Sequence, residues 1–155
     1  MIKKQYVLGF MTDDSDNVLL IKKTKPEWQN GFLNGIGGKI ELVNVSMFEN
    51  YEWPEDAMVR EFKEETGIET TKKQWRLVTT AESSNFYMYV YHTHVPDIFE
   101  LNPRTTTEEE VSIVTIHRVG LEKVLPSARS FLYMCRATAN TFTFIGSAIP
   151  YAVAI

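Results

Sequence analysis

The strongest structural signal in the sequence is one helix between residues 54 and 66. Pro54 suits the first helical turn, where its missing N–H has no partner to lose, and Glu55 and Asp56 suit the positive end of a helix. Gly67 is typical of the position after a helix C-terminus, because glycine adopts the left-handed conformation found there. The order of these residues predicts a helix from Pro54 to Thr66.

Three glutamates crowd one edge of this predicted helix. At about 100° per residue, Glu61, Glu64 and Glu65 are neighbours at spacings of three and four. Like charges at this spacing cost about 0.2–0.5 kcal/mol for each exposed pair. A hard cation reverses the repulsion, because Mg²⁺ binds carboxylate oxygens together with water and phosphates. Acidic runs on helices are more often solvated faces, so the interpretation as a metal site depends on the surrounding residues.

The rest of the sequence alternates short apolar runs with turn residues, which predicts a sheet and a second helix. Tyr6–Met11 and Val18–Ile21 are expected to form a hairpin around the turn-rich segment 13–17. Further strands are expected at 75–81, 86–94 and 111–116, and helices at 121–125 and 127–139. Residues 142–155 are apolar but interrupted, which predicts a core strand or a docked tail.

The composition fits one globular domain spanning residues 1–155. The formal net charge is -4, and Lys and Arg are spread along the chain, which argues against a surface for a nucleic acid polymer. No apolar run is long enough for a bilayer, no signal peptide is expected, and the one cysteine, Cys135, suits a reducing compartment. We therefore expect a cytoplasmic protein without membrane contact that acts as a monomer or homodimer.

The region around the predicted helix resembles the Nudix box, G-x5-E-x7-R-E-U-x-E-E-x-G-U, in which U is a bulky apolar residue. Glu52 is followed by seven residues and then by Arg60-Glu61-Phe62-Lys63-Glu64-Glu65-Thr66-Gly67-Ile68, which meets every fixed position from Glu52 onward. Gly37-Gly38-Lys39-Ile40-Glu41 matches the usual start of the box. Residues 42–51 are then expected to be an inserted loop, which a surface site tolerates. The resemblance implies the α+β Nudix fold, an α/β/α sandwich around a mixed β-sheet, and a Nudix pyrophosphohydrolase activity.

The resemblance also implies a set of metal ligands. They are the carbonyl of Gly38 and the carboxylates of Glu61, Glu64 and Glu65, and one of these glutamates can serve as the base instead. Mg²⁺ is the expected cofactor, and Mn²⁺ is an acceptable substitute. We expect a further ligand or base directly before the strand at 111–116. Glu110 is the first choice there and Glu109 the second.

The other residues of the box receive supporting roles by the same resemblance. Arg60 would orient a carboxylate of the catalytic set, either Glu64 or Glu52. Glu52 is expected to be a structural partner of Arg60, and Gly67 to end the helix. An ordinary surface ion pair is the alternative for Arg60, and such a pair contributes under about 1 kcal/mol.

The segment Phe32–Lys39 is similar to that of MutT-like enzymes, which hydrolyse oxidised purine nucleoside triphosphates such as 8-oxo-dGTP. In that case Asn34 would bond a base edge, because an amide both donates and accepts, Phe32 would stack on the base, and Lys23 and Lys39 would contact phosphates. The alternatives are that Asn34 forms a turn, that Phe32 packs in the core, and that the two lysines are exposed without a specific contact. The box does not define the nucleotide, so ADP-ribose or a nucleotide sugar is an alternative substrate. A nucleotide-sensing domain without catalysis is a further alternative.

Overall fold

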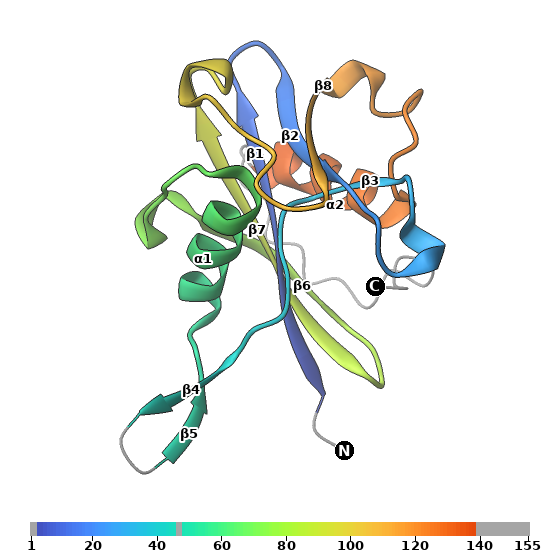
Figure 1. Cartoon of the computed structure of the whole chain (residues 1–155). Helices are drawn as coiled ribbons and strands as arrows, with labels where there is room; N and C mark the ends of the chain where they lie inside the picture. Colours follow the sequence, from blue (N-terminus) through green and yellow to red (C-terminus); the bar gives the residue numbers. More distant parts are fainter. Residues whose placement is uncertain (1–2, 46–47, 139–155) are drawn as a thin grey trace.

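A computed structural model of the chain describes residues 3–45 and 48–138, which form a mixed sheet between two helices (Figure 1). Helix α1 (Pro54–Thr66) packs on one face of the sheet and α2 (Pro126–Thr138) on the other. The sheet contains β1 (Lys4–Asp13), β2 (Asn17–Lys22), β3 (Leu33–Asn34), β6 (Arg76–Glu82), β7 (Phe86–Val95) and β8 (Glu110–Thr115). The α/β/α sandwich expected from the sequence is confirmed.

The long strand β1 is the centre of the sheet. It pairs in parallel with β7 along its whole length, and β6 pairs antiparallel with β7 at the edge. The predicted hairpin of β1 and β2 forms, and its two paired positions lie next to the turn, Met11 with Leu19 and Thr12 with Val18. On its other side β2 pairs antiparallel with β8. The parallel pair joins segments far apart in the chain, which short-range patterns do not predict.

Beyond the turn, β1 and β2 diverge, and residues 33–39 cross from one strand to the other. Strand β3 pairs with the end of β2, and then Ile36 and Lys39 form isolated bridges to β1. This part of the chain is therefore a two-residue strand followed by a bridged, glycine-rich segment. This path carries Gly37 and Gly38 to the side of α1.

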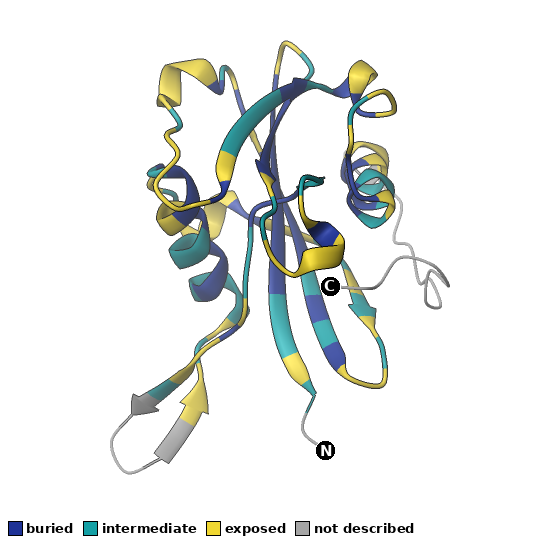
Figure 2. Cartoon of the chain, turned by 45° about the vertical axis from the view of Figure 1, so that its right-hand side comes forward, coloured by how far each residue is buried: buried dark blue, intermediate teal, exposed yellow. Residues whose placement is uncertain are grey.

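Apolar side chains fill both faces of the sheet, as the dark blue residues of Figure 2 show. On the α1 face Met58 and Phe62 are fully buried, and the ring of Phe62 meets Trp75 edge-on at 4.9 Å between centroids. On the α2 face Phe131 and Leu132 are buried in the second core. Because the buried stripe fixes the rotation of α1 about its axis, it also decides where the glutamates of this helix point.

The expected loop at 42–51 contains two paired strands, at 42–45 and 48–51. Strand β4 (Leu42–Val45) pairs antiparallel with β5 (Phe48–Tyr51), and this small sheet is separate from the main one. The physical reason is the β-branched and aromatic composition of the segment, which favours extended backbone. Figure 1 shows the hairpin projecting below α1.

The expected short helix at 121–125 is also wrong, because the segment pairs with β3. The N–H of Leu33 donates to the carbonyl of Lys123 and that of Leu125 to the carbonyl of Leu33. Short 3₁₀ turns occur instead at η1 (Glu27–Gln29), η2 (Lys72–Gln74), η3 (Phe99–Leu101) and η4 (Ile116–Arg118). The expected strand or tail at 142–155 lies outside the described residues. Within the described ranges, no helix has the length and apolar character needed to cross a membrane.

Candidate active site

Helix α1 begins and ends as the sequence predicts, and its acidic edge runs from buried to exposed. Gly67 caps the helix in the left-handed conformation with φ 73°, and its N–H donates to the carbonyl of Lys63. Glu65 is buried, with 9% of its surface exposed. The side chain of Glu61 is 13% exposed and that of Glu64 is 55% exposed. One end of this edge therefore lies inside the protein, and the other end faces solvent.

The glycine-rich segment presses against the buried end of the edge. The backbone N–H of Gly37 donates to Oε2 of Glu65 at 3.1 Å. A Cβ atom placed on Gly38 would lie 2.5 Å from the carboxylate atoms of Glu61. Only glycine lets the backbone approach Glu61 this closely, so the two glycines and two of the three glutamates form one continuous surface.

Arg60 holds several carboxylates at once. Its Nη2 atom donates to Oε1 of Glu52 at 2.5 Å, and its Nη1 atom donates to Glu61 at 2.8 Å and Glu64 at 3.2 Å. Nη2 also donates to the backbone carbonyl of Lys39 at 3.1 Å. Glu52 and Glu64 were alternative partners of Arg60 in the sequence, and the structure contains both contacts.

Two neighbouring glutamates at the start of β8 face opposite ways. Glu109 directly precedes the strand, and Glu110 is its first residue. Val111 and Ile113 pack toward the α1 core and Val114 toward the α2 core, so side chains alternate between the faces. By this alternation Glu109 points to the α1 side and Glu110 to the α2 side. Glu109 is 8% exposed, whereas Glu110 is exposed.

Glu109 is held in place by the end of β2. Its carboxylate accepts from Lys23 Nζ at 2.6 Å and from the backbone N–H of Thr24 at 3.0 Å. It is also close enough to Glu65 to act on that group electrostatically. The structure thus brings Glu109, the second choice of the sequence, to the α1 glutamates and leaves Glu110 apart from them.

Burial and mutual repulsion set the protonation of the cluster. Burial is the main cause that raises the pKa of Glu65 to about 8. The charges of Glu61 and Glu109 contribute to this rise, and Lys23 and the Gly37 N–H oppose it. Burial also raises the pKa of Glu61, although the hydrogen bond from Arg60 opposes this. At Glu52 burial is outweighed by hydrogen bonds from Arg60 and the Glu41 N–H, which lower the pKa of that carboxyl.

This donor set fits a hard divalent cation. Within residues 3–45 and 48–138, no three His, Cys, Asp or Glu side chains already converge on one point, because Glu61 and Glu64 are turned toward Arg60 and Glu65 toward Gly37. Mg²⁺ needs only one or two protein carboxylates, with water and substrate phosphates as its other ligands. Burial disfavours the charged form of a carboxylate and so raises its pKa. A cation beside such a carboxylate stabilises the charged form.

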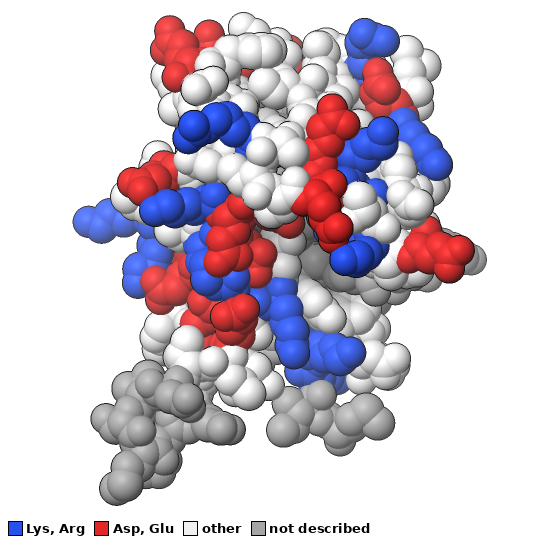
Figure 3. Space-filling view, viewed as in Figure 1, with Lys and Arg blue, Asp and Glu red and all other residues white. Residues whose placement is uncertain are grey.

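A pocket opens on the other side of the two glycines. Asn34 and Lys23, two of the predicted substrate contacts, line it together with Gly37, Gly38 and Gln29. In the space-filling view, acidic side chains over α1 and over the segment before β8 lie on either side of the middle of the molecule (Figure 3). Because Gly37 and Gly38 line the pocket and also contact Glu65 and Glu61, the glycine segment separates the pocket from the acidic edge as a common wall.

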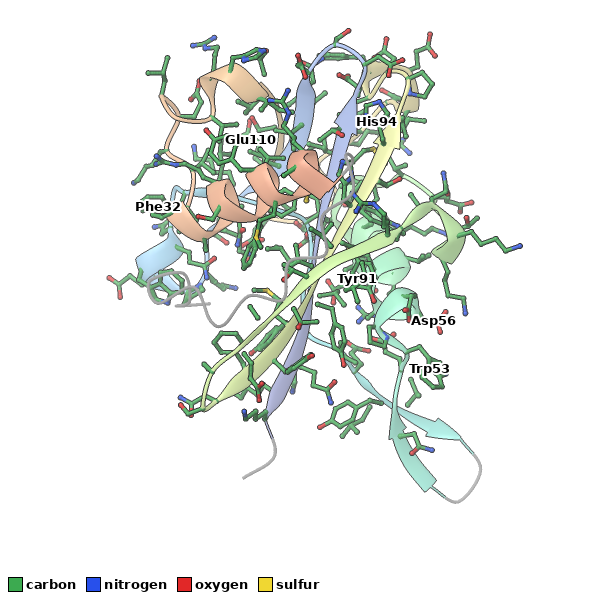
Figure 4. All side chains as sticks on the ribbon, turned by 180° about the vertical axis from the view of Figure 1, so that it is seen from behind. Phe32, Trp53, Asp56, Tyr91, His94 and Glu110 are labelled. Carbon is green, nitrogen blue, oxygen red and sulfur yellow. The ribbon has the colours of Figure 1, made fainter. Side chains whose placement is uncertain are left out.

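The two other predicted substrate contacts lie outside this pocket. Phe32 carries the ammonium of Lys123 over its ring at 4.5 Å from the centroid, and it lies toward the α2 side in Figure 4. Lys39 is exposed and lines a separate groove with Glu61. Gln29 was not among the predicted residues, because it lies outside both the Nudix box and the segment Phe32–Lys39. Strand alternation counted back from Val111 was the signal that could have placed Glu109 ahead of Glu110.

The mixed sheet between two helices and the glutamate-rich helix edge beside a glycine segment together define a class of metal-dependent hydrolase. The profile of the NUDIX domain matches residues 3–135. The chain therefore belongs to the Nudix family, and its enzyme class is that of the Nudix pyrophosphohydrolases. Members of this family generally use divalent metal ions. A sequence search among curated proteins found no significant match.

Several solved structures share this fold at low sequence identity. A MutT Nudix hydrolase from Burkholderia pseudomallei superimposes with a TM-score of 0.64 at 19% identity, covering 86% of this chain and 98% of its own. The Nudix domain of Shewanella oneidensis NrtR, solved with ADP ribose, gives 0.70 at 12% identity and 90% coverage of both chains. A bifunctional NMN adenylyltransferase/ADP ribose pyrophosphatase from Francisella tularensis, solved with AMP and a Mn ion, gives 0.66 at 15% identity, covering 88% and 42%.

Proposed function

We propose that this chain hydrolyses a nucleoside triphosphate to the nucleoside monophosphate and pyrophosphate in a Mg²⁺-dependent reaction. The observation that carries the proposal is the shared wall. Gly37 and Gly38 contact the carboxylates of Glu65 and Glu61 on one side and line the pocket with Asn34 on the other. A ligand in the pocket would thus hold its phosphates next to the acidic edge.

The residues have distinct tasks in this reaction. Glu61, Glu64 and Glu65 would hold Mg²⁺ with the Gly38 carbonyl, and Glu109 replaces Glu110 as the additional carboxylate. When bound, the ion neutralises phosphate charge and lowers the pKa of a coordinated water. The water oxygen bonds to the α-phosphorus while the bond from that phosphorus to its bridging oxygen breaks. Pyrophosphate leaves with the bonding electrons, and a carboxylate of the cluster accepts the proton of the water.

Arg60 and Lys23 keep the carboxylates in position. Arg60 donates to Glu61 and Glu64 and so limits the rotamers available to them. Lys23 does the same for Glu109. Arg60 and Lys23 are also cations close to where the substrate phosphates would lie, so both would support the binding of an anionic substrate.

The proposal is tested with a substrate panel in Mg²⁺ buffer, in which released phosphate and pyrophosphate are measured. The panel contains ordinary and oxidised purine dNTPs, ADP-ribose and nucleotide sugars. ADP-ribose is included because one of the similar structures contains it and another is an ADP ribose pyrophosphatase. Triphosphates should be hydrolysed with release of pyrophosphate, and a preference for ADP-ribose would move the assignment to the diphosphate class.

Two variants test the acidic edge directly. Glu64→Gln and Glu65→Gln should each lose most turnover, because the amide removes a metal-binding charge at nearly constant volume. Glu69→Gln is the matched control, since Glu69 is exposed just beyond the helix. Circular dichroism should show that all three variants remain folded. Full turnover in both Glu64→Gln and Glu65→Gln would show that the acidic edge is not the catalytic site.

A further inference from the structure

The pocket beside the glycines contains one buried polar group that the reaction does not use. Gln29 ends the turn η1 and is only 1% exposed. Its Oε1 atom is fully buried, and no described residue donates a hydrogen bond to it. Buried acceptors nearly always have a partner, so an unpaired amide oxygen on a residue that lines the pocket indicates a group that pairs with something else.

One part of the pocket lining is apolar. It consists of Tyr6, Leu8, Met88, Leu125 and Phe131, of which Tyr6 packs against the α2-side core and the others belong to it. Lys23, Lys25 and Ser127 also line the pocket. A sugar or a phosphate gains little from the apolar part, because its polar groups would lose water without replacement. A flat heteroaromatic ring buries its faces there and presents its edge to the few polar groups.

The polar groups of the pocket are complementary in type. Oδ1 of Asn34 already accepts the N–H of Gly35 at 2.8 Å, and its Nδ2 group makes no hydrogen bond to a described residue. Asn34 therefore offers a donor, and Gln29 offers an acceptor. The edge of an amino-substituted purine carries an N–H donor close to a ring nitrogen or carbonyl acceptor, which matches this pair.

We propose that Gln29 is a specificity-determining residue, whose Oε1 accepts a hydrogen bond from an N–H on the purine edge of the nucleotide. The inference deepens the proposed function, on which it rests, by naming the part of the substrate that the α2-side pocket recognises. A base without an N–H leaves the buried oxygen unpaired in the complex. Such a base should be rejected strongly, because sites built around a hydrogen bond discriminate against ligands that lack it.

Calorimetric titration with nucleoside monophosphates tests the inference without turnover. The wild-type protein should bind AMP or GMP at least about tenfold more tightly than purine riboside monophosphate, which has no N–H on its ring system; tenfold is the order expected for one hydrogen bond. In Gln29→Met the two affinities should agree within about twofold, since the side chain keeps its length and loses the amide. Gln5→Met, in a separate groove near Trp53, should keep the wild-type ratio.

The outcomes separate the two proposals. If the wild type shows no preference, or if Gln29→Met keeps the full ratio, Gln29 does not recognise the base. Binding of none of the three nucleotides also overturns the inference. Failure of the hydrolase assignment is seen separately, as absence of released phosphate and pyrophosphate across the substrate panel. The wild-type comparison needs no variant, so it stands even if Gln29→Met does not fold.

Discussion

Replacing Arg60 by methionine should destabilise the protein far more than a typical helix-surface change. Arg60 is the partner of Glu52 and Glu61, whose side chains are 11% and 13% exposed, while its own side chain is 24% exposed. Removing one member of a largely buried ion pair leaves the other charge without a partner, which costs about 3–5 kcal/mol. Because Arg60 retains some solvent contact, we expect a loss of about 3 kcal/mol in the free energy of unfolding.

Urea unfolding followed by circular dichroism measures this loss. At an m-value of about 2 kcal/mol per M, the unfolding midpoint should fall by roughly 1.5 M. Lys63→Met is the control on the same helix, because its ion pair with Glu69 lies in solvent, with side chains 59% and 77% exposed. Its midpoint should not change measurably. A double-mutant cycle with Glu52→Gln then isolates the coupling of Arg60 to Glu52.

The reasoning is refuted if Arg60→Met shifts the midpoint no more than Lys63→Met does. That result would make the Arg60 contacts ordinary surface ion pairs, the alternative that the sequence left open. A destabilised variant with normal turnover would contradict a different step, namely the positioning of Glu61 and Glu64 by this guanidinium.

Two further predictions concern close contacts and pH. Gly38→Ala should lower turnover at least about tenfold while changing the melting temperature little, because the new methyl displaces the flexible carboxylate of Glu61 and small shifts at a reacting centre are costly. Gly120→Ala is the control and should leave turnover unchanged, because nothing lies within 4 Å of a Cβ at that position. Normal turnover in Gly38→Ala would contradict the role of Glu61. Burial is the main cause that lowers the pKa of His92 from 6.5 to about 4, and the charges of Arg76 and His94 add to the effect. Between pH 6.5 and pH 4 the unfolded chain therefore binds more protons than the folded chain. The stability of the fold decreases as the pH falls through this range. Relative to His92→Gln, the wild type should lose about 2 kcal/mol between pH 7.5 and pH 5. Parallel pH curves for wild type and His92→Gln would show that the His92 ring titrates normally.

The local elements could be predicted because their causes lie close together in the chain. Helix α1 begins at Pro54 and ends at Gly67 as its capping residues indicate. The box residues from Glu52 to Ile68 identified the family before any fold was known. The strand positions followed from apolar alternation in the same way. Each of these signals depends on residues within a few positions of one another.

Long-range placement could not be predicted in the same way. That β1 pairs with β7, some eighty residues later, as well as with its neighbour β2 depends on the free energy of the whole sheet. Residues 42–51 were interpreted as a loop because they interrupt the Nudix box, although the β-branched and aromatic residues of the segment favour the strands β4 and β5. The choice between Glu109 and Glu110 depended on strand phase, since a shift of one residue reverses the face.

The carboxylate-rich helix edge and the glycine pair can be identified in the sequence, because residue types and their spacing are local properties of the chain. Contacts between distant segments depend on the folded protein: Gly37 and Gly38 contact Glu65 and Glu61, Glu109 lies near them, and Gln29, with its unpaired amide oxygen, lines the adjoining pocket. The physical reason is that burial and contact arise from packing. Segments far apart in sequence come together only when apolar surface on both faces of the sheet leaves water.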